Sequence, residues 1–167
     1  MKHKNHLILT LLILIINISL DRTTKLLAIR FLEGKDTISL FYNTVILKYA
    51  ENTGAFLSFG SSWPDISKYI VLIIIPILAC LVGLYYCAFK LADKKLVVII
   101  VSIIGGGLSN LADRLFHNFS VVDFINFGIG NLRTGILNVA DMSVTFGMLF
   151  LIIYQLKENK TKTKTQE

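Results

Sequence analysis

Four long apolar stretches take up most of this 167-residue chain, and they constrain its fold more than any other feature. The clearest, at residues 69–89, contains no charged side chain. The others are predicted at residues 7–29, 96–112 and 136–156. A helix needs about 20 residues to cross a bilayer, so four spans with short connections use up the whole length. The sequence therefore predicts an all-α membrane protein with four transmembrane helices.

The composition agrees with a membrane class. Hydrophobic residues make up 54% of the chain and charged residues only 17%, whereas a soluble domain carries about 25% charged residues. A net charge of +6 could suggest nucleic acid, but the basic residues lie at the chain ends and in short gaps between apolar runs. That placement is typical of membrane topology, so we expect membrane lipids and no nucleic acid as partners.

The lysines also predict an orientation. Nine of them fall on one side of four alternating spans, close to the span ends, and the other side holds eight lysines and arginines in longer loops. The positive-inside rule then places both termini in the cytoplasm. Residues 157–167 would form a polar, disordered cytoplasmic tail. The outer side would hold a β-region at about 36–60 and a second loop at about 113–135.

Two short segments with alternating hydrophobicity lie within the first outer region. Their apolar members are Ile38, Leu40, Tyr42, Val45, Leu47 and Tyr49. Asn43 and Thr44 separate the two segments, as in a β-hairpin. We expect a small extracytoplasmic β-cradle whose apolar face lies against lipid or substrate.

Ionisable groups at the outer ends of the spans are the strongest functional signal. They are Asp21 with Lys25, Asp113 with Arg114, Asp123 and Asp141. Such groups are costly in a membrane, so each favours a functional hypothesis. A structural explanation is also possible for Asp21 with Lys25 and for Asp113 with Arg114. In each pair the opposite charges neutralise one another, which lets the end of a span lie among the lipid headgroups. A glycine run at 105–107 favours close helix packing over a backbone donor site.

Several catalytic classes fit the sequence poorly. A zinc peptidase lacks ligands, because there is no HExxH motif and His117 is the only histidine on the outer side. Cysteine catalysis is excluded because Cys80 and Cys87 lie inside a span. A serine and lysine dyad is harder to dismiss, since Lys25 lies at the right depth, but the spacing favours no particular serine. The outer serines considered are Ser58, Ser61 and Ser62.

A pair of aspartates is the economical arrangement for hydrolysis. Two carboxyl groups that share a site cannot both ionise cheaply, so one stays protonated while the other acts as base. Asn138 can cap the fourth span, which places Asp141 in its first turn, where the helix dipole favours negative charge. We therefore expect Asp141 to be the ionised member and Asp123 the more often protonated one.

The ordered polar motifs resemble those of the signal peptidase II family, also called lipoprotein signal peptidases. They read DRTTK at 21–25, NTGA at 52–55, GGLSNLADR at 106–114, VVDF at 121–124 and NVAD at 138–141. The resemblance covers residues 7 to about 156. It implies an aspartyl endopeptidase of the bacterial cytoplasmic (inner) membrane, with its site at the outer face and no cofactor or metal. Such enzymes remove signal peptides from diacylglyceryl-modified prolipoproteins, cutting before the lipidated cysteine.

By motif position, the resemblance makes Asp123 and Asp141 the catalytic dyad. The positions implied to support the dyad or hold substrate are Asp21, Lys25, Asn52, Gly54, Asn110, Asp113, Arg114, Asn138 and Ala140. Lys25 and Arg114 can hold lipid phosphate or peptide carbonyls, and the asparagines can satisfy polar groups around the dyad. The departures from the family pattern, which bear on substrate fit, are Arg22, Phe56, Ser109, Phe119 and Leu137.

Two other classes of protein remain as alternatives. A small proton-coupled transporter subunit would use its acids as a relay, but a relay lines its acids through the bilayer thickness. Here the acids gather at one end of the spans. A scaffold protein without chemistry would tolerate Asp123→Asn and Asp141→Asn.

Overall fold

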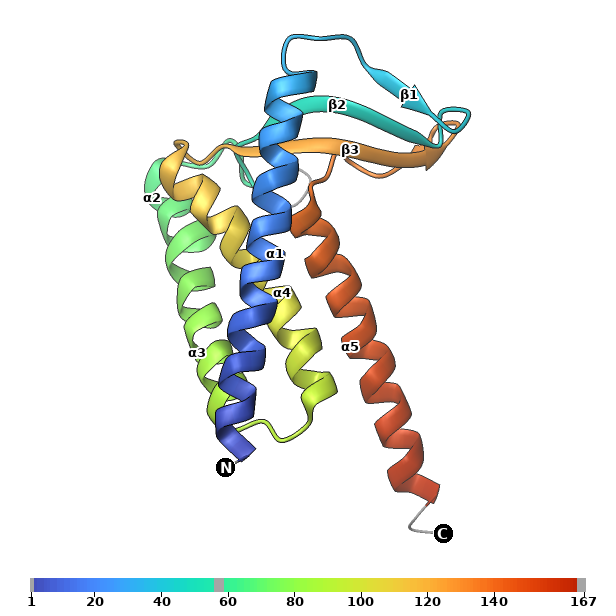
Figure 1. The fold of residues 1–167 in the computed structure, drawn as a ribbon. Helices are drawn as coiled ribbons and strands as arrows, with labels where there is room; N and C mark the ends of the chain where they lie inside the picture. The colour runs from blue at the N-terminus through green and yellow to red at the C-terminus, as the bar shows by residue number, and fades with distance from the viewer. Residues whose placement is uncertain (1, 56–58, 165–167) are drawn as a thin grey trace.

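Four long helices and a small sheet make up the protein (Figure 1). The computed structural model describes residues 2–55 and 59–164. In the described part, the helices are α1 (Lys2–Leu32), α2 (Asp65–Lys68), the π-helix η2 (Tyr69–Ile74), α3 (Ile75–Phe89), α4 (Lys94–Phe116) and α5 (Val139–Lys164). The helical segments from α2 to α3 follow one another directly, and Pro76 lies in the first turn of α3. Proline has no N–H to donate, and its ring clashes with the carbonyl one turn earlier. The wider π-turn before Pro76 makes room for this ring, so the helix continues.

Four helical segments have the length and composition of membrane spans. They are His6–Leu32, Asp65–Phe89, Lys94–Phe116 and Val139–Asn159. The four-helix part of the predicted fold class is confirmed. The helices run a few residues beyond the predicted limits, except that α5 begins at Val139, three residues after the predicted start at 136. The expected disorder after residue 157 is wrong as far as Lys164, because α5 continues to that residue. Its last turns contain no glycine or proline that would end a helix.

The sheet combines both outer segments of the chain. It contains β1 (Ile38–Leu40), β2 (Val45–Asn52), β3 (Val121–Ile129) and β4 (Leu132–Arg133), antiparallel in the order β1-β2-β3-β4. The predicted hairpin corresponds to β1 and β2 and is confirmed. The second outer region was expected to be a loop, and that was wrong because two strands of the sheet lie there.

The sheet lies at the end of the helices opposite both chain termini (Figure 1). A small core joins it to the first helix, because Ala28 and Leu32 of α1 are buried against Phe124 of β3, with Leu47 of β2 beside them. This core fixes β3 relative to α1. It thereby determines where the side chains of β3 meet the ends of the spans.

Glycines allow α4 to approach its neighbours closely. A Cβ atom on Gly105 would lie 2.9 Å from the Cβ of Asn17 in α1, and one on Gly106 would lie 2.5 Å from the backbone oxygen of Ala140 in α5. Both distances are shorter than carbon and oxygen atoms tolerate, so these two positions confirm the predicted close helix packing. The second contact brings α4 against the first turn of α5, which carries Asp141.

This contact predicts a difference between adjacent glycines. We expect Gly106→Ala to lower the free energy of unfolding by about 1–3 kcal/mol, because the new methyl group must push α4 away from the backbone of α5. Gly107→Ala is the matched control, since its nearest neighbour would be Cys80 Sγ at 3.8 Å. Thermal unfolding of both purified variants measures the difference. Equal destabilisation would show that the α4–α5 contact does not require a glycine.

Candidate active site

Asn138 connects the two aspartates of the predicted dyad. Asp123 lies on β3 and Asp141 in the first turn of α5. The side-chain amide of Asn138 donates to Asp123 Oδ1 at 2.6 Å. Its oxygen accepts a hydrogen bond from the Asp141 backbone N–H at 2.8 Å, and Asp141 Oδ2 accepts one from the Asn138 N–H at 3.3 Å. This reciprocal pair caps α5, as the sequence predicted, and the same asparagine also contacts the second acid.

Asn52 holds Asp123 from the other side. It is the last residue of β2, and the antiparallel pairing of β2 with β3 brings the two side chains together. Its amide donates to Asp123 Oδ2 at 3.2 Å, while its oxygen accepts from the Gly54 N–H at 3.0 Å. Both oxygens of Asp123 are therefore held by amide donors.

Asn110 holds Asp141 and links it to a buried cation. Its amide donates to Asp141 Oδ1 at 2.8 Å, and its oxygen accepts from Lys25 Nζ at 2.8 Å and from the Asn138 amide at 3.2 Å. Since Asn110 lies in α4 and Lys25 in α1, these contacts tie three helices to the dyad.

Lys25 is the centre of a buried charge network. Its side chain is 0% exposed, and its ammonium lies 2.7 Å from both Asp21 Oδ2 and Asp113 Oδ2. Asp21 Oδ1 also accepts a hydrogen bond from the backbone N–H of Ala140 at 2.8 Å. The network therefore connects α1 and α4 to the start of α5.

Two expectations about charged residues are corrected here. Lys25 cannot hold a lipid phosphate, because its ammonium is fully buried between carboxylates. Asp113 does not pair with its neighbour Arg114 as expected; it pairs with Lys25 and with Arg22, whose Nη1 lies 2.8 Å from Asp113 Oδ1. Adjacent helix residues point in different directions, about 100° apart, which explains why the sequence neighbours separate.

Two departures from the family pattern contribute to this network. Arg22 pairs with Asp113, and Ser109 donates to Asp21 Oδ2 at 2.6 Å. The sequence interpretation missed both roles, although Arg22 lies three residues before Lys25 and thus shares a helix face with it. The Ser109 contact crosses from α4 to α1, so no spacing in the chain could have indicated it.

Two of the other departures, Phe119 and Leu137, affect the backbone, and the third, Phe56, lies outside the described residues. Phe119 has a left-handed backbone, with φ of 67°, and glycine adopts that conformation at little cost. Leu137 forms backbone hydrogen bonds with Phe124 and Ile125, which hold the segment before α5 against β3. Phe56 and the candidate Ser58 lie outside the described residues.

Arg114 lies between the dyad and the first outer segment. Its guanidinium donates from Nη2 to the Gly54 backbone oxygen at 2.6 Å and from Nη1 to the Asn110 backbone oxygen at 3.2 Å. Within residues 2–55 and 59–164, its Nε has no hydrogen-bond partner. The backbone oxygens of Gly54 and Asn110 use two of the five N–H donors of the guanidinium.

A cavity of about 400 Å³ opens beside these residues. Asn110, Arg114 and Asp141 supply its polar lining. The apolar lining comes from Ala55, Phe59, Val71, Leu72, Pro76, Gly107, Leu111 and Val144. A chain with apolar side groups can therefore lie along the span ends while its polar backbone faces Asp141. The apolar lining residues were not singled out from the sequence, because nothing distinguishes them there from other lipid-facing residues.

The protonation of Asp123 follows from its surroundings. Burial and the nearby negative charge of Asp141 raise the pKa of Asp123 to about 7, against the opposing effect of its hydrogen bonds from Asn52 and Asn138. Its pKa thus lies well above that of an ordinary aspartate, in the range where a carboxyl group can act as an acid at neutral pH. Which of the two acids is more often protonated stays a prediction.

The predicted site residues meet in one connected region. The members of this hydrogen-bonded network are Asp21, Lys25, Asn52, Gly54, Asn110, Asp113, Arg114, Asp123, Asn138, Ala140 and Asp141. Over residues 2–55 and 59–164, no three His, Cys, Asp or Glu side chains gather as a metal-binding group. The arrangement suits proton transfer between carboxyl groups and a bound molecule.

The fold and the site define a multi-pass membrane protein with paired aspartates at one end of its helices. A family model described as Signal peptidase (SPase) II matches residues 13–157. The chain belongs to the signal peptidase II family, and it is therefore a protease. It is 33% identical over 172 residues to a lipoprotein signal peptidase of Treponema denticola, covering 97% of this chain and 99% of the relative.

Another relative and a solved structure agree with this assignment. A lipoprotein signal peptidase of Clostridium tetani is 36% identical over 151 residues, covering 89% of this chain and 93% of the relative. A bacterial membrane enzyme solved by the in meso method at 2.3 Å resolution superposes with a TM-score of 0.78 at 27% identity. That match covers 92% of this chain and 90% of the other. The family resemblance and the predicted fold class are confirmed.

Proposed function

We propose that the protein is an aspartyl endopeptidase that removes signal peptides from diacylglyceryl-modified prolipoproteins, cutting before the lipidated cysteine. The observation that carries this proposal is the link through Asn138 between Asp123 and Asp141. The names of the relatives supply the substrate class, since they are lipoprotein signal peptidases. The cavity beside Asp141 supports it, because an apolar peptide segment fits a mostly apolar lining.

The two acids would divide the chemistry. Ionised Asp141 takes a proton from a water molecule, whose oxygen attacks the scissile carbonyl carbon, while protonated Asp123 donates a hydrogen bond to the carbonyl oxygen. The C–N bond then breaks as Asp141 passes its proton to the leaving nitrogen. The amides of Asn52, Asn110 and Asn138 hold both carboxyl groups through this cycle. They act as positioning residues.

Arg114 would position the substrate. Arg114 lines the cavity, and a peptide carbonyl is a suitable acceptor for a guanidinium N–H. Two of its five donors already hold the backbone oxygens of Gly54 and Asn110, so the guanidinium is fixed in place. A fixed donor orients the substrate backbone without losing side-chain freedom on binding.

The orientation in the membrane is part of the same proposal. Both termini lie at the helix ends opposite the sheet (Figure 1), and the lysine-rich segments belong to that end. The positive-inside rule then places the termini in the cytoplasm and the dyad at the outer face of the bacterial cytoplasmic membrane. Lipidated precursors with an anchored signal peptide would reach the dyad from the lipid phase.

The proposal is tested by cleavage of a defined precursor. Purified protein is mixed with a diacylglyceryl-modified prolipoprotein and with the same precursor carrying an unmodified cysteine. We expect cleavage of the modified precursor only, and mass spectrometry should give a product that begins at the lipidated cysteine. Absence of cleavage would contradict the proposal, and a transporter subunit with an acidic relay would give that result. Equal cleavage of both precursors would show that the enzyme does not require the diacylglyceryl group.

The pKa of Asp123 predicts the pH dependence of cleavage. Because Asp123 must be protonated while Asp141 is ionised, raising the pH through about 7, the pKa of Asp123, removes the acid form. We expect kcat/KM to fall about tenfold per pH unit on the alkaline side of this value. A pH–rate profile with the modified precursor measures it, with lipid composition held constant. A constant rate up to about pH 9, well above that pKa, would contradict the assigned role of Asp123.

A further inference from the structure

The net charge of the chain is concentrated at the helix ends that carry the termini. Segments 1–6, 90–95 and 157–167 contain nine lysines and three acids, whereas the rest of the chain contains eight basic and eight acidic residues. The whole excess of +6 thus belongs to one end of the bundle, opposite the predicted dyad. An anionic partner is favoured there.

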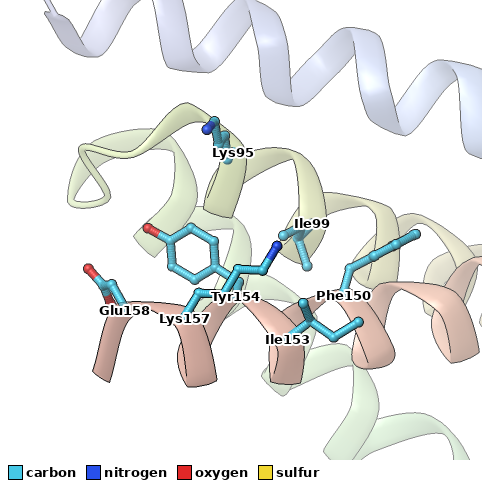
Figure 2. Close-up of a pocket in the computed structure, with 7 residues that line it drawn as sticks. All are labelled: Lys95, Ile99, Phe150, Ile153, Tyr154, Lys157 and Glu158. Atoms are coloured by element: carbon cyan, nitrogen blue, oxygen red, sulfur yellow. The ribbon is translucent and has the colours of Figure 1, made fainter. Parts of the chain in front are cut away.

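A pocket of about 440 Å³ lies between α4 and α5 at this end. Figure 2 shows Ile99 on α4 facing Phe150, Tyr154 and Lys157 on α5, with Lys95 at the start of α4. The two exposed lysines therefore come from different helices to one pocket. The remaining lining residues are Ile153 and Glu158. The charged groups of the pocket are therefore two ammonium groups and the carboxylate of Glu158. A rim with a net positive charge above an apolar wall suits a lipid phosphate above its acyl chain.

The carboxylate of Asp93, close to this pocket, already has donors of its own. Asp93 caps α4, with Oδ1 accepting from the Lys95 backbone N–H at 2.7 Å, and its Oδ2 accepts a hydrogen bond from the Tyr154 hydroxyl. The contact between Asp93 and Tyr154 joins the start of α4 to α5 beside the pocket. The Asp93 carboxylate therefore has two donors besides the positive charge of Lys95.

A second, mostly apolar pocket of about 420 Å³ continues the first. The two pockets share Ile99 and Phe150 and therefore adjoin, and together we call them the α4–α5 groove. On α5 its lining runs from Lys157 to Val139, which is about 27 Å at the helical rise. One leaflet of a bilayer has about 15 Å of hydrocarbon. The groove is therefore long enough for the acyl chain of a lipid whose phosphate lies at the lysines.

We propose that the α4–α5 groove binds one anionic phospholipid. Its phosphate lies between Lys95 and Lys157, and one acyl chain lies between the helices against Ile99 and Phe150. The apolar lining accommodates any phospholipid chain, and the two lysines discriminate in favour of a headgroup with net negative charge. The headgroup end of this groove lies at the other end of the helices from the dyad, and its apolar part extends to Val139, in the same helical turn as Asp141.

Lipid titration of the intact protein tests the proposal. Detergent-purified full-length protein is titrated with phosphatidylglycerol and with phosphatidylcholine of the same acyl chains, and bound lipid is counted by native mass spectrometry. We expect one phosphatidylglycerol to be retained with about 10-fold higher affinity than phosphatidylcholine, since each lysine near an anionic headgroup contributes attraction. Equal affinity for the two lipids would overturn the proposal.

Paired lysine variants test whether the lipid preference comes from Lys95 and Lys157 or from the overall positive charge of the protein. Lys95→Gln with Lys157→Gln should abolish the preference, while the matched pair Lys35→Gln with Lys48→Gln, exposed lysines at the sheet end, should preserve it. Loss of preference in both pairs would mean general charge attraction and overturn the site. Thermal unfolding of each pair checks that the fold is intact.

The groove is tested at Ser102, which lines its apolar part. Ser102→Phe should lower retention of both lipids at least several-fold, whereas Ser19→Phe on the exposed side of α1 should leave it unchanged. Undiminished retention in Ser102→Phe would overturn the acyl-chain placement. Displacement of phosphatidylglycerol by an unlipidated signal-peptide helix would show instead that the groove holds peptide, and it would also overturn the proposal.

Discussion

Asp123→Asn and Asp141→Asn are each expected to lower the rate of precursor cleavage by about 10⁴-fold, without unfolding the protein. An amide in place of the Asp141 carboxylate cannot take a proton from water, and an amide in place of the Asp123 carboxyl group cannot pass one to or from the substrate oxygen. Residues that act as a unit show non-additive losses, so the double variant should be little worse than either single variant. Initial rates with the diacylglyceryl-modified precursor measure all three.

Asp36→Asn is the matched control for this experiment, because Asp36 is an exposed acid in the loop after α1. It removes the same charge from the outer side and should leave the rate unchanged. Thermal unfolding should show that each dyad variant stays folded, since the loss of like-charge repulsion offsets part of the cost of turning an NH2 group toward an amide donor. If either dyad variant cleaves at the parental rate, that aspartate is not part of the chemistry, and the scaffold alternative regains support.

The fold was predictable as far as hydrophobic patterns reach. Four long, mostly apolar runs predict four spans because a bilayer permits few other backbone arrangements. Alternation predicted the first hairpin. The strand β3 was not predicted, because its sequence from Val121 to Ile129 places Asp123 and Asn126 among apolar residues and its burial does not alternate. Only the pairing with β2 makes it a strand, and that partner lies about 70 residues earlier in the chain.

The residues of the site were predictable, but their partners were not. Motifs and the cost of buried charge singled out Asp21, Lys25 and Asp113. The spacing of Asp21 and Lys25 correctly predicted their contact, since it is local to one helix. The partners of Asp113 and Ser109 lie on α1, and three-dimensional packing selects them over sequence neighbours. Local chemistry is thus visible in the sequence, whereas contacts between helices are not.

Lys25→Met is the second substitution with a large expected effect. Lys25 is completely buried, and its removal leaves Asp21 and Asp113 in the interior with one cation fewer. Breaking a buried charge pair in this way costs about 3–5 kcal/mol of unfolding free energy. Asn110 also loses its donor from Lys25, so the support of Asp141 loosens and cleavage should fall. Equilibrium unfolding in detergent measures the stability, with the exposed Lys48→Met as control.

The charge network also predicts which second substitution rescues this variant. After Lys25→Met, Asp113 still has Arg22 at 2.8 Å. Among the described residues, the donors that remain to Asp21 are neutral ones, Ser109 and the Ala140 N–H. Adding Asp21→Asn should therefore recover about half of the lost unfolding free energy or more, since it removes the uncompensated charge. Adding Asp113→Asn should recover less, because it leaves Asp21 charged and takes the partner from Arg22. Equal recovery by the two double variants would mean that Lys25 neutralises both acids alike and that Arg22 contributes nothing to Asp113.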